Sequence, residues 1–150
     1  MNPLLPPPLV AALIGVLMWA VARQLALGRF ASAALAPIAI VLLAVGLLLF
    51  LVAAASFITA KTTINPLRPA RATHLITSGV FRISRNPIYL ADLLILAALA
   101  VWLGNIVNLL ILGLFVWAIN RFQIAPEERA LTRLFGDNYI AYCSQVRRWL

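Results

Sequence analysis

The sequence predicts an all-α integral membrane protein of about four transmembrane helices, because its composition, its apolar runs and its charge distribution agree. Of the 150 residues, 64% are hydrophobic and 11% are charged, with a mean hydropathy of +1.01. A soluble domain is about half apolar and about a quarter charged. This length suits one domain, so we expect a single domain over residues 1–150, with a two-helix part (1–60) and a core (61–150).

Two long uncharged runs in the N-terminal part predict the first two transmembrane helices. Residues 4–22 form the first run, and Pro6, Pro7 and Pro8 suit its first helical turn, where a missing N–H costs no hydrogen bond. Residues 31–60 form the second run, which exceeds the roughly 20 residues needed to span a bilayer. Because no Lys or Arg precedes Leu9, we interpret the first run as a membrane helix and not as a cleaved signal peptide.

The second half of the chain predicts a short helical hairpin. Between residues 86 and 120 the single charged residue is Asp92, and Gly104-Asn105 divides this run at a sequence suited to a tight turn. As a helix, residues 88–103 would extend roughly 24 Å, which is less than the ~30 Å hydrocarbon core. We therefore expect these two helices to cross only just, or to stop near the far interface.

Basic residues differ in number between the two ends of the predicted bundle. Arg23 and Arg29 lie between the first two helices, whereas ten basic residues lie before the third helix or after the fourth: Lys61, Arg68, Arg71, Arg82, Arg85, Arg121, Arg129, Arg133, Arg147 and Arg148. Lys and Arg are enriched on the cytoplasmic side, so both termini are predicted to be cytoplasmic. We interpret the net charge of +8 as a topology signal with contacts to anionic lipids, and not as a nucleic-acid site.

The C-terminal segment predicts two further helices outside the membrane core. Pro126 before two glutamates is typical of a helix start, and Gly136 is typical of a helix end. Asp137 is predicted to cap a second short helix, one face of which carries Tyr139, Cys143 and Val146. The single cysteine excludes an internal disulfide and a cysteine-based metal cluster, and we predict no metal site.

Taken singly, the polar residues around the third helix each have a structural explanation. Arg82 and Arg85 are suited to anchoring the helix at the interface, the acids at 127–128 suit a helix N-terminus, and His74 suits a loop. Asp92 is more informative, because a carboxylate in a membrane segment usually faces a partner or a wet cavity. An ion pair with Arg85 or Arg82 is the simplest explanation for it.

Taken together, these residues follow an order that resembles a known family. The order is T-S-G-V-F-x-x-x-R-N-P-x-Y, then a short apolar hairpin, then E-E, then F-G-x-x-Y-x-x-Y. It resembles the isoprenylcysteine carboxyl methyltransferase family, membrane enzymes with phospholipid and thiol methyltransferase relatives, over about residues 73–146. The resemblance implies a methyltransferase that uses S-adenosylmethionine, with its cofactor-binding core in residues 61–150.

The resemblance also implies which residues bind S-adenosylmethionine. Carried over position by position, they are Thr73, His74, Leu75, Ile76, Phe81, Arg85, Asn86, Pro87, Ile88, Tyr89 and Glu127. Their chemistry fits: the Glu127 carboxylate accepts hydrogen bonds from hydroxyls or an amine, and Asn86 and Tyr89 are neutral donors. Phe81 is suited to stacking on the adenine or packing on the sulfonium methyl. Methyl transfer then depends mainly on holding nucleophile, methyl and sulfur in line.

Three departures from the family pattern concern the acceptor side. Asn86 replaces a histidine, residues 147–150 replace a T-G-x-P-F tail, and Gln123 replaces the arginine that the family places against the substrate carboxylate. A glutamine does not neutralise a carboxylate, so a prenylcysteine is not the expected acceptor, and an amine, a thiol, a neutral group or another lipid carboxylate stays open. Arg121 is the nearest arginine. Asp92, Gln123 and Arg121 are therefore the candidate catalytic or acceptor-binding residues.

The sequence predicts a hydrophobic or amphiphilic small-molecule acceptor that enters between the third and fourth helices. The expected location is a bacterial or archaeal inner membrane, with the active site on its cytoplasmic side. Two alternatives are a non-enzymatic small membrane protein and a membrane reductase with related helix packing that uses a nicotinamide cofactor. The ordered polar motifs favour the methyltransferase, and the sequence indicates no oligomeric state.

Overall fold

The computed structural model describes residues 6–25, 28–30, 34–60 and 74–150, and helices joined by loops and turns make up these ranges. Its elements in chain order are α1 (Pro7–Gln24), α2 (Leu35–Thr59), the 3-10 turn η2 (Gly79–Arg82), α3 (Pro87–Leu103), α4 (Val107–Ile119), the π-helical segment η3 (Asn120–Ile124), α5 (Ala125–Phe135) and α6 (Asp137–Gln145). Within the described residues, extended pairing is limited to an isolated bridge between Arg29 and Asn105. The predicted all-α class is confirmed.

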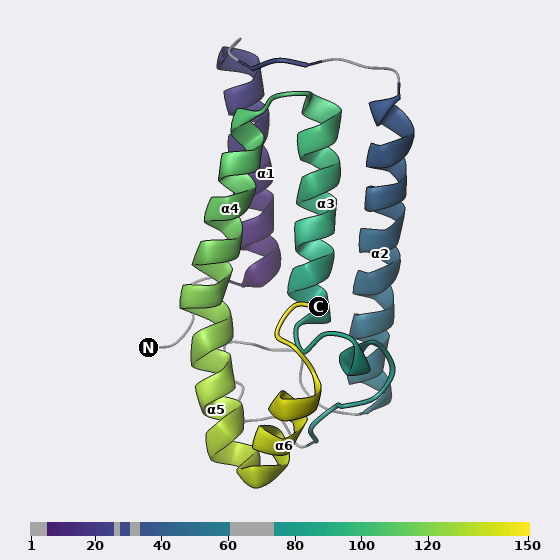
Figure 1. The fold of residues 1–150 in the computed structure, drawn as a ribbon, viewed down its shortest axis with the longest axis vertical. Coiled ribbons are helices and arrows are strands. Elements are labelled where there is room, and N and C mark those ends of the chain that lie inside the picture. The colour runs from purple at the N-terminus through teal and green to yellow at the C-terminus, as the bar shows by residue number, and fades with distance from the viewer. Residues whose placement is uncertain (1–5, 26–27, 31–33, 61–73) are drawn as a thin grey trace.

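The long helices lie side by side as a bundle, with α5 continuing beyond α4 and α6 folded back beneath it (Figure 1). Three helices of the described chain are long and apolar enough to cross a membrane: Pro7–Gln24, Leu35–Thr59 and the continuous helix Val107–Phe135. The fourth apolar helix, Pro87–Leu103, has 17 residues, in agreement with the short third helix that the sequence predicts. The chain is therefore an integral membrane protein.

The predicted turn at Gly104 is confirmed, and it packs against the connection between α1 and α2. Gly104 ends α3 in the left-handed conformation (φ 59°, ψ 45°), and a Cβ at this position would clash with the carbonyl oxygen of Phe30. The Phe30 N–H donates to the Gly104 carbonyl at 2.8 Å, and the Asn105 side chain donates to the Leu25 carbonyl at 2.9 Å. These bonds join the two halves of the chain at the end opposite the polar motifs.

A close contact between α2 and α3 depends on Gly46. A Cβ at this position would lie 2.9 Å from Ile95 Cγ1 and 3.1 Å from the Ala91 carbonyl oxygen. Small residues let helix backbones approach closely in a membrane, where apolar burial does not drive association. Gly46 therefore brings α2 against the first half of α3.

Side chains from α1, α3 and the long Val107–Phe135 helix meet in the centre of the bundle. The buried members of this cluster are Met18, Tyr89, Leu96, Ala100, Ile111, Phe115, Ile119 and Ile124. A second, smaller cluster of Tyr139, Tyr142 and Val146 holds α6 beneath the bundle, and Cys143 packs on it. The predicted apolar face of the last helix is thus buried.

The structure confirms one detail of the C-terminal helices and corrects another. Pro126 lies in the first turn of α5 with Glu127 and Glu128, as predicted, but α5 continues from α4 through η3 within the helix Val107–Phe135. A proline in a helix lacks an N–H and clashes with the carbonyl four residues earlier, and the wider π turn at Asn120–Ile124 avoids this, with the Ala125 N–H bonded to the Asn120 carbonyl. Asp137 does not cap α6, because Gly136 occupies the cap position and Asp137 is the first helical residue.

Candidate active site

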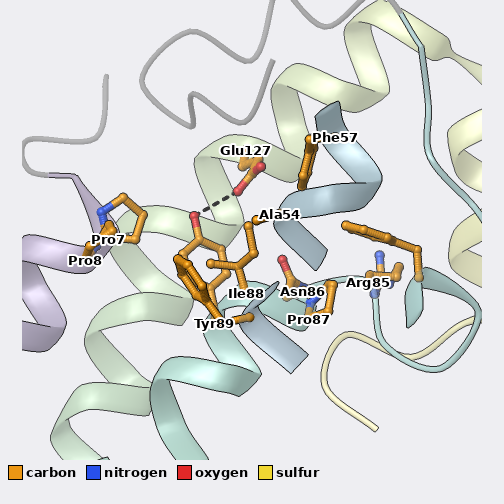
Figure 2. A pocket seen from close by; sticks show the side chains of 12 residues that line it. Pro7, Pro8, Ala54, Phe57, Arg85, Asn86, Pro87, Ile88, Tyr89 and Glu127 are labelled. Carbon is orange, nitrogen blue, oxygen red and sulfur yellow. Dashed lines mark hydrogen bonds between the residues drawn. The ribbon is translucent and has the colours of Figure 1, made fainter. Parts of the chain in front are cut away.

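A cavity of about 300 Å³ lies where α1, α2, the start of α3 and the start of α5 meet (Figure 2). Seven of its lining residues belong to the motifs that the sequence singles out: Phe81, Arg85, Asn86, Pro87, Ile88, Tyr89 and Glu127. The other five are Pro7, Pro8, Phe50, Ala54 and Phe57. The polar side chains of the lining, Arg85, Asn86, Tyr89 and Glu127, thus all come from the motif residues, whereas α1 and α2 contribute apolar side chains.

Tyr89 and Glu127 point toward one another across this cavity (Figure 2). The Tyr89 hydroxyl donates a hydrogen bond to Glu127 Oε2 at 3.0 Å. Tyr89 lies in the first turn of α3 and is 5% exposed, whereas Glu127 lies in the first turn of α5. Two residues that are 38 positions apart in the sequence thus form one polar pair.

Glu128 faces a different set of neighbours from Glu127. Arg148 binds both of its oxygens, with Nε to Oε1 at 3.0 Å and Nη2 to Oε2 at 2.6 Å. Arg85 Nη1 lies 3.2 Å from Glu128 Oε1 and donates to Cys143 Sγ at 2.6 Å. The chain thus joins α5, the loop before α3 and the C-terminal segment through one carboxylate.

Hydrogen bonds to main-chain carbonyls hold the same loop to the C-terminal segment. The Arg85 N–H donates to the Arg147 carbonyl at 3.0 Å, and Asn86 Nδ2 donates to the Arg148 carbonyl at 2.9 Å. The Asn86 N–H donates to the Ser84 hydroxyl at 3.1 Å. Trp149 continues the contact, because its Nε1 donates to Asn120 Oδ1 at 3.3 Å and its ring packs on the central cluster.

Phe81 is held in the cavity wall from two sides. Its ring packs edge-on against Phe57 of α2, with centroids 5.4 Å apart and planes at 87°. Its carbonyl accepts a 2.6 Å hydrogen bond from the Tyr142 hydroxyl of α6. Burial raises the pKa of Tyr142 to about 12, so this hydroxyl keeps its proton and its donor role well above neutral pH.

Three of the predicted cofactor-binding residues, His74, Leu75 and Ile76, do not line the cavity. Thr73 lies outside the described residues. His74 is exposed, and Leu75 packs against the Tyr139, Tyr142 and Val146 cluster. Ile76 is half-buried and is not part of the lining.

The candidate catalytic residues also lie outside the cavity lining. Asp92 and Gln123 are both buried, at 5% and 4% exposure, whereas Arg121 is exposed. The structure does not form the expected pair between Asp92 and Arg85, because Arg85 contacts Glu128 instead. Asp92 Oδ2 is buried and has no hydrogen-bond partner in the described part of the chain.

The sequence does not predict the residues that α1, α2 and the C-terminal segment add to this site. In the sequence, Pro7 and Pro8 look like ordinary helix-start residues. Phe50, Ala54 and Phe57 belong to a uniformly apolar helix, so no local signal marks them as cavity-lining residues. Arg148 did carry a signal, because it belongs to the tail that departs from the family pattern.

Comparison with known proteins decides the family. The family model described as phospholipid methyltransferase matches residues 34–138, which include α2 through the start of α6. The chain belongs to the phospholipid methyltransferase family. Ten of the twelve lining residues fall inside the match, because only Pro7 and Pro8 precede it. The predicted resemblance to this group of membrane methyltransferases is therefore confirmed.

Relatives of this phospholipid methyltransferase family member include both small and larger proteins. An uncharacterized protein of Haemophilus influenzae is 52% identical over 62 residues, which are 41% of this chain and 98% of that protein. Protein-S-isoprenylcysteine O-methyltransferases of Schizosaccharomyces pombe and Arabidopsis thaliana (form B) are each 32% identical over 72 residues, or 48% of this chain. The match spans 30% and 36% of those two enzymes, and no solved structure matches.

Proposed function

We propose that this chain is an S-adenosylmethionine-dependent methyltransferase that acts on a lipid-like or small hydrophobic acceptor. One observation carries the proposal: seven residues that the family resemblance assigns to the cofactor line a single cavity, although 38 positions separate Tyr89 from Glu127. The relatives that carry a functional name are methyltransferases, which supports the same reaction class. The basic residues at the cavity end support a cytoplasmic site in a bacterial or archaeal inner membrane.

The polar side chains that line the cavity fit the polar groups of S-adenosylmethionine. The cofactor carries a carboxylate, an ammonium, two ribose hydroxyls, an adenine and the sulfonium methyl that it transfers. Glu127 is the acidic residue and Arg85 the basic residue of the described lining, so the cavity offers one acceptor for hydroxyls or the ammonium and one cation for the carboxylate. Within the described part of the chain, Arg85 Nε is buried without a hydrogen-bond partner, and such a donor is costly unless an acceptor arrives.

The apolar wall of the cavity supports a hydrophobic acceptor. Pro7 and Pro8 of α1 and Phe50, Ala54 and Phe57 of α2 present hydrocarbon where the two helices flank the cavity. This lining favours an approach from the side of α1 and α2 over the predicted approach between α3 and α4. Asp92, one helical turn beyond Tyr89, then serves to orient the polar head of the acceptor or to take its proton.

Calorimetric titration of the purified chain with S-adenosylmethionine tests this proposal. We expect wild-type binding, and an affinity about tenfold lower in Glu127→Gln, because the amide loses the charge that makes a strong acceptor. Tyr89→Phe should weaken binding less, since it removes only the 3.0 Å bond that orients Glu127.

Glu128→Gln is the matched control, because Glu128 contacts Arg85 and Arg148 and does not line the cavity. It should lower the melting temperature and leave the cofactor affinity near that of the wild type. Wild-type affinity in Glu127→Gln would remove Glu127 from the site. A wild-type chain that does not bind the cofactor would contradict the proposed function.

A further inference from the structure

Arg85 of the cavity lining lies together with Glu128 and Arg148, and this group of three side chains carries a net positive charge. Glu128 is shared by two arginines, Arg85 and Arg148. The two contacts are unequal: Arg148 binds both carboxylate oxygens, at 3.0 and 2.6 Å, whereas Arg85 reaches one oxygen at 3.2 Å. A two-point bond between a guanidinium and a carboxylate is the stronger arrangement. Arg148 is therefore the main partner of Glu128, and one positive charge is left over.

This remaining charge lies on Arg85, at the wall of the cavity. The Arg85 side chain is 14% exposed and that of Arg148 is 41% exposed, so water screens Arg148 more strongly. The second partner of Arg85 Nη1 is the thiol of Cys143 and not another acid. Arg85 Nε is buried and has no hydrogen-bond partner among the residues that the structure describes. A buried guanidinium with an unmet donor is suited to an anionic ligand.

We propose that Arg148 is a positioning residue: by binding Glu128 it leaves the charge of Arg85 uncompensated, so that Arg85 binds the carboxylate of S-adenosylmethionine. This inference rests on the proposed function and assigns a role to the segment that departs from the family pattern. Without Arg148, Arg85 is the remaining cation that pairs with Glu128 among the described residues. The two would then pair more closely, and Arg85 would present little net charge to the cavity.

Removing the charge of Glu128 together with that of Arg148 distinguishes this electrostatic role from one in which Arg148 only holds the loop before α3 in place. We expect Arg148→Gln to bind S-adenosylmethionine about tenfold more weakly than wild type in calorimetry. The double variant Glu128→Gln/Arg148→Gln should recover to within about threefold of wild type, because no acid then competes for Arg85. Arg148→Lys should keep most of the affinity, since it preserves the charge. The main-chain bonds of Arg148 remain in all three variants.

Two controls sharpen the test. Arg133→Gln removes one exposed charge from the same end of the molecule and should leave the affinity unchanged. The decarboxylated analogue of S-adenosylmethionine lacks the group that Arg85 is proposed to bind, so it should bind wild type and Arg148→Gln equally. Melting temperatures of each variant show whether it is folded.

The outcomes distinguish the two proposals. If wild type binds the cofactor but Arg148→Gln binds it equally well, Arg148 has no such role. If the double variant is as weak as Arg148→Gln, or if the decarboxylated analogue loses affinity in parallel, the segment acts by tethering and the inference is overturned. A wild-type chain without affinity for the cofactor overturns the proposed function, and this inference falls with it.

Discussion

Glu127 and Glu128 show how one helical step separates two roles at the scale of single residues. Adjacent residues in a helix point about 100° apart, so two neighbouring acids do not face one ligand. Glu127 meets Tyr89 at the cavity, and Glu128 meets Arg85 and Arg148 beneath it. The acidic pair that looks redundant in the sequence thus divides into a cavity group and an anchor for the loop and the C-terminal segment.

Asp92 is the residue whose role the structure changes most. The pairing with Arg85 that would have explained a carboxylate near the interface is not formed, because Arg85 binds Glu128. Asp92 instead lies buried, with Oδ2 lacking a hydrogen-bond partner in the described part of the chain. An unmet buried carboxylate oxygen lowers stability, and such costs concentrate at functional sites.

We therefore expect Asp92→Asn to raise the melting temperature by a few degrees and to lower turnover by about a hundredfold, as loss of a general base does. Cofactor affinity should stay unchanged, since Asp92 does not line the cavity. Thermal melting, calorimetry and a radiolabelled methyl-transfer assay measure the three quantities. A joint fall in melting temperature and cofactor affinity would return Asp92 to the role of a loop anchor.

At the scale of elements, the π-helical segment Asn120–Ile124 sets the direction of Glu127. It holds one extra residue in a turn, so everything after it is rotated relative to α4. Pro126 lies just beyond this segment and disfavours the ordinary helical bond at that place. We infer that Pro126 favours the π turn and thereby helps to direct Glu127 toward Tyr89.

Pro126→Ala tests this use of the π turn. With a normal N–H available, we expect the segment to relax to an α-helix and to rotate Glu127 by about 100° away from Tyr89. Cofactor affinity should fall by about tenfold while the melting temperature is kept or raised. Calorimetry and thermal melting report the two effects. Unchanged affinity would mean that the π turn persists without Pro126.

Gly46, at the contact between α2 and α3, and Gly113 of α4 make a matched pair for substitution by alanine. A Cβ at Gly46 would press on Ile95 and on the Ala91 carbonyl, whereas a Cβ at Gly113 of α4 meets nothing within 4 Å. We expect Gly46→Ala to cost about 1–3 kcal/mol of stability, and Gly113→Ala to be neutral or to stabilise slightly. Melting of both variants in the same detergent measures the difference. Equal effects would show that α2 and α3 shift apart without strain.

At the scale of the whole molecule, the bundle separates its charges by end. Arg23 and Arg29 lie beside Leu103 and Gly104 at one end of the bundle, and the cavity lies toward the other end. α5 and α6 gather at that second end (Figure 1). The end with more arginines also holds the candidate active site. A water-soluble cofactor would then enter from the cytoplasm and a hydrophobic acceptor from the bilayer.

Reporter fusions test this orientation. Fusions after Gly28 and Gly104 should report the outside of the cell, because both residues lie at the end with fewer basic residues, and a fusion after Leu150 should report the inside. Alkaline phosphatase and a fluorescent protein make a suitable pair, since each is active on one side only. An outside signal after Leu150 would place the cavity away from cytoplasmic cofactor and would contradict the proposed site.

The sequence alone determined the helical class, the turn at Gly104 and the basic end. These features follow from local patterns, since apolar runs, glycine and charge act on their near neighbours in the chain. The family resemblance, which rests on motif order along the sequence, pointed to residues 85–89 and 127, which line the cavity, and to the roles proposed for them.

Only the tertiary structure decided what completes the site. The apolar wall from Pro7, Pro8 and α2, the π turn before Pro126, and the choice of Glu128 over Asp92 as the partner of Arg85 all depend on helices distant in sequence. An apolar run does not reveal which face meets a cavity, because every side of a membrane helix is hydrophobic whether it contacts lipid or protein. Several acids competing for one arginine likewise look equivalent until packing sets their distances.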